Sequence, residues 1–364
     1  MRIKKWAGQL VSMKRYLSDR AKKYHDVTDP KNRIAMLSDH LRWIWREREF
    51  NHHYYSMGLN SRGKNVADFL GRRSLTWYRN SYADLLRNNF SGDETGSEDI
   101  LIKDKFYCSA ILRAGGIGTI DTLFLFTNGN CHPITGTGTL SDLPEGDYFL
   151  KNTVMESGYG ITGFAVKDGE ILLGDGRPGL PATQAITQKG RWIVQKKISS
   201  HPSIQAVNGS ALNTTRIYTI VTVNGIDYMG GYQAFATGSS ETDSWQHGSV
   251  YVSIDPINNR LGRYGITSQS DPHDGVIFQH PDSKIVFEGY EIPFIADSVA
   301  LCLKAHSLFD RAFVIGWDIA ITAHGPMVVE ANENPGINVL QCLEGGISRR
   351  VKEAYGEMRR KHHD

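Results

Sequence analysis

The chain has 364 residues, 40% of them hydrophobic, so it can bury a sizeable core spread over two or three domains or lobes. Its 41 basic and 39 acidic residues leave a formal net charge of +2. This balance argues against a dedicated nucleic-acid-binding or membrane-surface protein.

The four cysteines and the N-terminus bear on the cellular compartment. Cys108, Cys131, Cys302 and Cys342 are scattered without a CxxC pair. This spacing fits reduced thiols and predicts a cytoplasmic protein without a zinc site. The N-terminal stretch MRIKKWAGQLVSMKRYL is basic but has no apolar run long enough for a signal sequence or a membrane span. We interpret it as a surface helix rather than a membrane-surface anchor.

Residues 1–103 are predicted to form a helical N-terminal region. They are rich in Arg, Lys, Trp and Tyr, and apolar residues recur at helical spacing in AMLSDHLRWIWREREF and NSYADLLRNNF. The polar segment NFSGDETGSEDI predicts a loop before the next unit.

Residues 104–198 begin as a helix and continue as strands. DKFYCSAILRAGG predicts a helix, with Asp104 near its start and glycines at its end. DTLFLFTNG predicts a strand closed by an Asn-Gly turn, and GDYFLKN, GITGFAVKDGEILLG and RWIVQKKI predict further strands. We expect these residues to form one lobe.

Residues 199–364 are expected to form a second lobe, in which antiparallel strands dominate. TTRIYTIVTVNGIDYMGGYQAFA and HGSVYVSIDPINNRLG predict strands separated by turns. FIADSVALCLKAHSLFD predicts an amphipathic helix, and GWDIAITAHGPMVVEANENPG follows it as a hairpin.

That hairpin carries polar side chains where its pattern predicts a core. Asp318 lies on one strand, Glu330 and Asn332 share a face of the next, and antiparallel pairing would bring the three together. Carboxylate and amide oxygens are the ligands that Mg²⁺ prefers. The alternative is that each side chain is exposed to solvent or paired with an arginine.

Two basic residues in strands predict anionic partners. Lys151 ends the apolar strand GDYFLKN, where an unpaired ammonium group is costly. Arg216 lies among β-branched residues in NTTRIYTI, and its planar guanidinium group can bind two phosphate or carboxylate oxygens at once. A structural salt bridge is the competing interpretation for Arg216. The loop MESGYG follows Lys151 and suits either a mobile phosphate cover or an ordinary hairpin turn.

The spacing D-x(11)-E-x-N and the motifs SALNTTRIYTI and GWDIAITAHGPMVVEANENPG resemble the sugar-transfer associated family of the ATP-grasp superfamily. The resemblance covers residues 104 to about 345. It implies an α+β class protein with the ATP-grasp fold, in which two α+β lobes clasp ATP beside the helical N-terminal region.

The resemblance also implies roles for individual residues. Asp318, Glu330 and Asn332 would hold one or two Mg²⁺ ions, with Mn²⁺ as a substitute. Arg216, Lys151 and Asn334 would act in catalysis. The nucleotide would contact Lys105, Lys151, Glu156, Ser157, Gly158, Tyr159, Gly160, Gln195, Lys196, Lys197, Ile198 and Arg216.

The chain departs from the resembling families at two positions. Lys196 follows Gln195 at a position where the family often has an acidic residue. A contact between adenine and the backbone is still expected there, but recognition of adenine by the side chain is in doubt. Gly316 stands where several peptide-forming ligases have an arginine, so the acceptor need not be a simple amino acid.

The activity implied is an ATP-dependent carboxylate–amine ligase that forms an amide through an acylphosphate, in polysaccharide or natural-product biosynthesis. Its partners would be small-molecule carboxylates and amines, sugar-linked or carrier-borne, with no nucleic acid, and the oligomeric state stays open. The alternatives are a kinase that phosphorylates a hydroxyl and a nucleotide-binding module without turnover.

Overall fold

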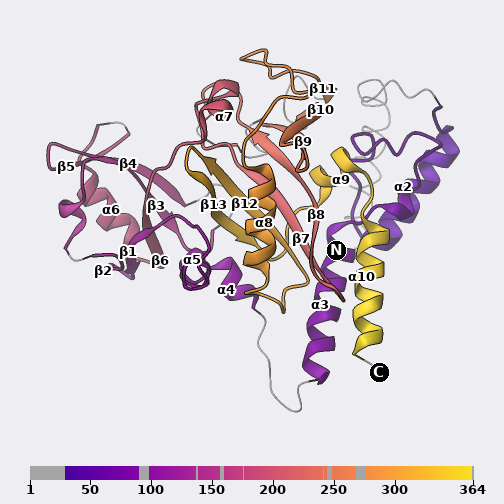
Figure 1. Cartoon of the computed structure of the whole chain (residues 1–364), viewed down its shortest axis with the longest axis horizontal. Helices are drawn as coiled ribbons and strands as arrows, with labels where there is room; N and C mark the ends of the chain where they lie inside the picture. The colour runs from indigo at the N-terminus through magenta and orange to yellow at the C-terminus, as the bar shows by residue number, and fades with distance from the viewer. Residues whose placement is uncertain are drawn as a thin grey trace, which may run out of the picture.

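The computed structural model describes residues 29–89, 98–136, 138–155, 160–174, 176–240, 242–243, 248–267 and 276–362. Within these ranges the chain forms two antiparallel sheets with helices packed around the larger one (Figure 1). The fold is therefore of the mixed α+β class predicted from the sequence.

The six-stranded sheet has the strand order β2-β1-β6-β3-β4-β5. Its core alternates along the strands and includes Phe124, Leu150 and Val194, against which the helix α6 (Gly179–Thr187) is placed. The predicted Asn-Gly turn is confirmed, because Asn128 and Gly129 both have positive φ. The strands are β1 (Thr122–Thr127), β2 (Asn130–Pro133), β3 (Gly146–Asn152), β4 (Ile161–Lys167), β5 (Glu170–Leu173) and β6 (Arg191–Lys196).

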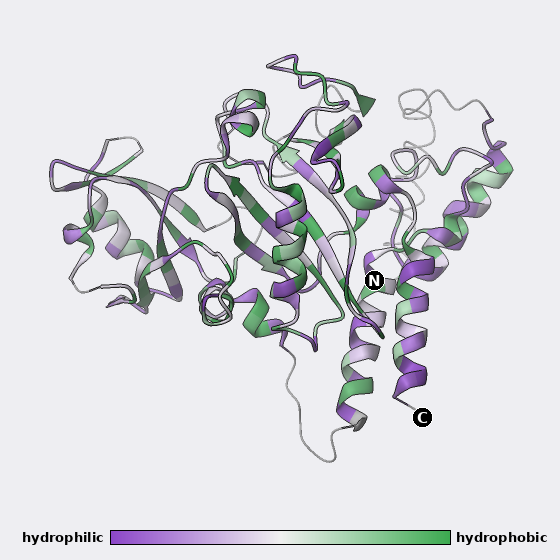
Figure 2. Ribbon diagram, viewed as in Figure 1, coloured by the Kyte–Doolittle hydropathy of each residue, from purple (hydrophilic) through white to green (hydrophobic). Residues whose placement is uncertain are grey.

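The seven-stranded sheet has the order β11-β10-β9-β8-β7-β12-β13, and every described pairing in it is antiparallel. Its strands are β7 (Thr215–Thr222), β8 (Gly225–Phe235), β9 (Val250–Asp255), β10 (Arg260–Thr267), β11 (Val276–Ile277), β12 (Val314–Thr322) and β13 (Gly325–Asn332). Hydrophobic residues recur along these strands (Figure 2) because side chains on both faces are covered.

One face of this sheet packs on the helix α8 (Ile295–His306), which lies across the strands in Figure 1. Ile217 and Trp317 of the sheet share a core with Cys302 of α8. Cys108 and Leu112 of α5 (Lys105–Ala114) belong to the same core. The helix expected to open the first lobe therefore packs against the larger sheet, and the lobe boundaries at residues 103 and 198 stay predictions.

The opposite face is covered by helices from both ends of the described chain. Tyr218 and Tyr232 of the sheet share a core with Trp43 and Leu75 of the N-terminal region and Met358 near the C-terminus. The helices on this face are α2 (Arg33–Glu47), α3 (Arg72–Asn89), α9 (Asn338–Glu344) and α10 (Ser348–Lys361), with the short helix η1 (Val66–Asp68). Of the remaining short helices, α4 (Asp99–Lys103) and α7 (Pro202–Val207) pack in the core on the α8 side, and η2 (Leu140–Asp142) packs on the six-stranded sheet.

All four cysteines are free; three are buried and Cys131 is exposed. None of the helices in the described ranges is both long enough and apolar enough to span a bilayer.

Candidate active site

The β12–β13 hairpin brings the predicted metal ligands together. Asp318 lies opposite Glu330, and Gly316 opposite Asn332, in the antiparallel register. A shift in register after Asp318 marks a bulge at this point of the ladder. The pairing that strand alternation predicted is therefore confirmed.

Arg216 of β7 binds Asp318 directly. The two residues are paired across β7 and β12, and the guanidinium donates from Nε to Oδ1 at 2.5 Å and from Nη2 to Oδ2 at 2.8 Å. Burial acts to lower the pKa of Arg216, but the facing Asp318 carboxylate, together with Tyr232 and Tyr218, holds this pKa well above its usual value. Asn332 Nδ2 also donates to Asp318 Oδ2 at 3.3 Å. The arginine partner that the sequence left as an alternative is thus present.

Lys105 reaches Glu330 from the N-terminus of α5. Asp104 caps this helix by accepting backbone N–H groups of its first turn, and Arg191 Nη1 donates to Asp104 Oδ2 at 2.9 Å. The Lys105 ammonium donates to the Met155 carbonyl at 2.6 Å and lies 3.4 Å from Glu330 Oε1. The cap and its arginine therefore fix where this lysine enters the site.

Lys151 is buried at the end of β3, with 9% of its surface exposed. Burial lowers its pKa to about 8, while the charge of Glu330 acts to raise it and that of Lys105 to lower it. Burial also raises the pKa of Glu330, against the opposing effect of Lys105. Lys105 therefore contacts the Glu330 carboxylate, and Lys151 lies near enough for the charges of both residues to act on it.

Three cations and two carboxylates meet in this cluster. Lys105 and Arg216 contact Glu330 and Asp318, and Lys151 is buried near Glu330. A divalent cation bound at the carboxylates would leave the three basic side chains available to an anionic ligand.

The oxygen atoms at this site fit a hard cation. In the described part of the chain, no group of three or more His, Cys, Asp or Glu residues could hold a metal, so the set depends on two carboxylates and amides. An ionised carboxylate has about four lone-pair sites, so Asp318 can bind a cation while it accepts from Arg216. Asn334 Oδ1, just after β13, is buried and has no hydrogen-bond partner. This unpaired buried oxygen, four residues after Glu330, could bind a cation or accept a hydrogen bond from a substrate N–H.

The predicted adenine segment leaves the small sheet at β6. Gln195 is buried and donates to the Ile120 carbonyl at 3.3 Å, and it lines a cavity of about 10 Å³ together with Lys105 and Glu330. The Lys197 N–H donates to the Asp147 carbonyl at 2.8 Å, so it is already paired within the sheet. The remaining candidates for a backbone contact with a base are the Lys197 carbonyl and the backbone groups of its neighbours Lys196 and Ile198.

The glycine-containing loop is described only at its ends. Glu156, Ser157, Gly158 and Tyr159 lie outside the described residues. At the loop base, the Asn152 N–H donates to the Gly160 carbonyl at 2.8 Å. Gly160 has φ of +70°, and a Cβ there would lie 2.7 Å from Met155 Sδ, which explains why glycine occupies it.

Sequence reasoning missed a third carboxylate near the cluster. Asp243 Oδ2 accepts from the backbone N–H and the hydroxyl of Thr214, both at 2.6 Å. Burial raises the pKa of Asp243 to about 6, opposed by the Thr214 hydrogen bonds, and Asp318 adds to the rise. Thr214 directly precedes the strand that carries Arg216. Asp243 is 29 residues away from Thr214, so no local pattern in the sequence indicates that the two are paired.

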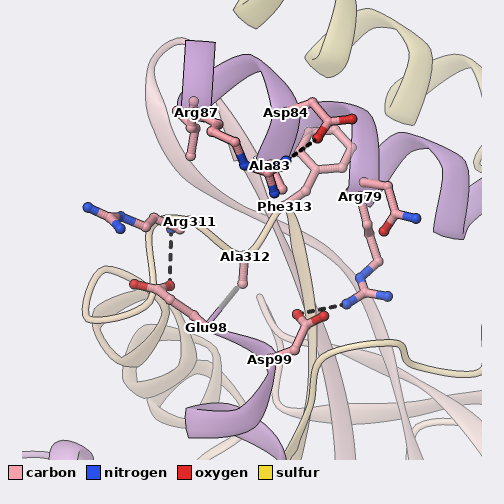
Figure 3. Close-up of a pocket in the computed structure, with 11 residues that line it drawn as sticks. Arg79, Ala83, Asp84, Arg87, Glu98, Asp99, Arg311, Ala312 and Phe313 are labelled. Atoms are coloured by element: carbon pink, nitrogen blue, oxygen red, sulfur yellow. Dashed lines mark hydrogen bonds and ion pairs between the residues drawn. The ribbon is translucent and has the colours of Figure 1, made fainter. Parts of the chain in front are cut away.

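A separate cavity of about 330 Å³ lies between α3, α4 and the segment before β12. Its ionic side chains are engaged: Arg79 binds Asp99 at 3.0 Å and Arg87 binds Asp84 at 3.2 Å, while Glu98 accepts the Arg311 N–H at 3.2 Å (Figure 3). None of the residues predicted to bind nucleotide or metal lines it.

Two sheets with a cationic and carboxylate cluster at the hairpin of the larger one define a protein of the ATP-grasp class, as the sequence predicted. A family model matches residues 93–354, which is most of the chain. The chain belongs to this family, described as sugar-transfer associated ATP-grasp.

The solved structures that match this chain share little of its sequence. The D-alanine–D-alanine ligase from Bacillus anthracis is 12% identical with a TM-score of 0.41, over 72% of this chain and 69% of that one. The corresponding Coxiella burnetii ligase is 11% identical with a TM-score of 0.38, over 72% and 59%. D-Cycloserine synthetase DcsG is 13% identical with a TM-score of 0.41, over 71% and 70%. Among curated proteins no match is found.

Proposed function

We propose that this protein is an ADP-forming carboxylate–amine ligase. The observation that carries the proposal is the cluster of Lys105, Lys151 and Arg216 around the carboxylates of Asp318 and Glu330, drawn from both sheets and α5. Such a cluster suits a triphosphate bound with a divalent cation. ATP-grasp proteins in general use ATP with Mg²⁺.

In this proposal the nucleotide lies between the two sheets, with residues 104–198 and 199–364 as the two lobes. The adenine edge meets the backbone of Lys196 and Ile198 at the end of β6. Lys105 and Lys151 meet the phosphates from one side and Arg216 from the other. The loop Glu156–Gly160 covers the phosphates, and its closure excludes water from the reacting group.

Asp318, Glu330 and Asn332 would hold Mg²⁺, one ion or two, which would neutralise charge on the phosphoryl oxygens when bound. The protein's own residues do the remaining work. Arg216 and Lys151 orient the terminal phosphate and stabilise its developing charge, and Asn334 uses its unpaired oxygen to orient the intermediate.

The proposed reaction has two balanced steps. A carboxylate oxygen of the first substrate attacks the γ-phosphorus, the bond to the bridging oxygen breaks, and ADP leaves with that electron pair. An amine nitrogen of the second substrate then attacks the acyl carbon, phosphate leaves, and the nitrogen loses a proton. Little covalent chemistry falls to the protein, so positioning and electrostatics dominate.

Gly316 supports an acceptor other than a simple amino acid. It lies opposite Asn332 with no side chain, and a Cβ there would lie 2.6 Å from Pro335 Cβ. The site therefore has no room for an arginine at this point. The family description links the protein to sugar transfer, so we propose a sugar acid or a carrier-borne carboxylate in polysaccharide or natural-product biosynthesis.

The test is an ADP-release assay with Mg²⁺ and ATP, in which pools of carboxylates are added with and without pools of amines. The proposal expects ADP and phosphate only when an acid and an amine are both present, with a product lighter than their sum by one water. A stable phosphorylated alcohol would identify a kinase instead. ATP binding without turnover under every pool would support the binding-module alternative.

A further inference from the structure

A stripe of large apolar side chains lies exposed on α2. Ile34, Leu37, Leu41 and Trp45 are 80%, 40%, 51% and 73% exposed. Their spacing of three, four and four residues puts them on one face of the helix. Trp43, on the opposite face, and Ile44, at the edge of the stripe beside Leu37, both belong to the core, so one apolar side of α2 is covered and the stripe is not. Hydrophobic residues recur along α2 in Figure 2.

The exposed face of α2 carries positive charge and no exposed carboxylate of its own. Arg33 and Arg42 are exposed and lie on either side of the stripe on the helical wheel. The two acidic residues of α2 are both buried in internal contacts. Asp39 accepts from Lys31 Nζ at 2.7 Å and from Tyr54 at 2.9 Å, and Glu47 pairs with Arg46 at 2.8 Å and with Ser74.

The small net charge of the whole chain is the sum of a strongly basic N-terminal part and an acidic remainder. Residues 1–89 contain 19 of the 41 basic residues but only 8 of the 39 acidic ones, which gives +11 for this part and −9 for the remainder. The residues that precede α2 contribute to this excess. A basic region joined to an acidic catalytic part points to an anionic partner of the basic region.

We propose that α2 lies on the surface of a lipid bilayer that contains anionic lipids. An interfacial helix buries an apolar stripe at the boundary of headgroups and acyl chains while flanking arginines meet lipid phosphates, and a tryptophan is favoured at that depth. The stripe with Trp45 and the flanking arginines matches both requirements. This site is independent of the proposed ligase reaction.

Two other occupants fit the surface less well. In a two-fold dimer through the same face, the arginines beside the stripe would approach their own copies, which is unfavourable. A nucleic acid would use the positive charge but gains little from exposed Ile and Leu side chains. A bilayer uses both features at once.

The position of α2 is compatible with docking during catalysis. In Figure 1, α2 lies at one end of the molecule and the six-stranded sheet at the other, with the larger sheet between them. Contact of α2 with a surface therefore leaves the predicted nucleotide cleft accessible.

The experiment is co-sedimentation of the full chain with vesicles of phosphatidylcholine, alone or mixed with phosphatidylglycerol. Two matched substitutions separate the stripe from general hydrophobicity: Ile34→Glu on α2, and Ile257→Glu in the β9–β10 turn, where the isoleucine is 88% exposed. A third variant, Leu41→Glu/Trp45→Glu, tests the remainder of the stripe. Circular dichroism melting verifies that each variant is folded.

The proposal expects binding to the anionic vesicles that weakens with added salt, falls at least about tenfold in Ile34→Glu and in the double variant, and is unchanged in Ile257→Glu. Equal binding by all variants would assign the contact to other basic residues and overturn the role of α2. No vesicle binding, combined with a dimer in sedimentation velocity that the double variant dissociates, would assign the stripe to a second copy. Salt-sensitive RNA binding without vesicle binding would also overturn the proposal.

Discussion

Replacing the buried Lys151 should stabilise the protein while removing its affinity for ATP. The pKa of Lys151 falls from 10.5 to about 8 on folding. At about 1.4 kcal/mol per pKa unit, holding this ammonium group buried costs up to about 3 kcal/mol of folding free energy. Lys151→Met keeps the side-chain length and removes the charge, so its free energy of unfolding should exceed that of the wild type at pH 7.

The pH dependence of this difference has a definite sign. Below pH 8 the lysine is protonated in both states and the full cost is present. Between pH 8 and 10.5 the folded lysine loses its proton while the unfolded one retains it, so the wild type gains stability relative to the variant. The advantage of Lys151→Met should therefore shrink across that window.

Urea unfolding of both proteins between pH 7 and pH 10 measures this difference, with Lys352→Met, at an exposed position on α10, as the matched control. The control should change stability little at any pH. Calorimetry with MgATP should show binding for the wild type and the control but not for Lys151→Met. A variant no more stable than the wild type at pH 7, or an advantage that does not vary with pH, would refute the assignment of a buried, destabilised ammonium group.

Three further substitutions test the site. Glu330→Gln should abolish Mg²⁺-dependent ADP release without unfolding the protein, and wild-type turnover would remove Glu330 from the metal set. Asp318→Asn should lower the free energy of unfolding by about 3 kcal/mol, because Arg216 then loses its charged partner; unchanged urea denaturation would contradict this. Gly316→Ala should lower the free energy of unfolding by about 1–3 kcal/mol, because the added methyl group would lie too close to Pro335. An unchanged melting temperature would show instead that the segment containing Pro335 moves to accommodate the methyl group.

The hairpin site could be predicted from the sequence because its residues lie on two neighbouring strands joined by one short turn. Strand alternation and one turn suffice to place Asp318 opposite Glu330, and the structure has that register. Strand β3 occupies the same residues that the motif GDYFLKN covers. Patterns of this kind depend on neighbours within one strand pair.

Other contacts could not be predicted, because they join residues that are distant in sequence. Arg216 and Asp318 are 102 positions apart, so the sequence leaves an ion pair open for each of them but does not identify the other as its partner. The helix α5 was expected in the first lobe, but Cys108 packs with the larger sheet. The exposed stripe on α2 had a helical pattern in the sequence, yet only the packing of its opposite face shows which apolar residues are left uncovered.

The most direct test of the ligase proposal is the fate of the carboxylate oxygen. A substrate acid found in the ADP-release screen is labelled with ¹⁸O in its carboxylate and turned over with Mg²⁺, ATP and the amine. An acylphosphate pathway predicts that one ¹⁸O per turnover appears in inorganic phosphate, because the acid oxygen bonded to phosphorus leaves with it. Phosphate free of ¹⁸O, with both labelled oxygens retained in the product, would contradict activation of the carboxylate.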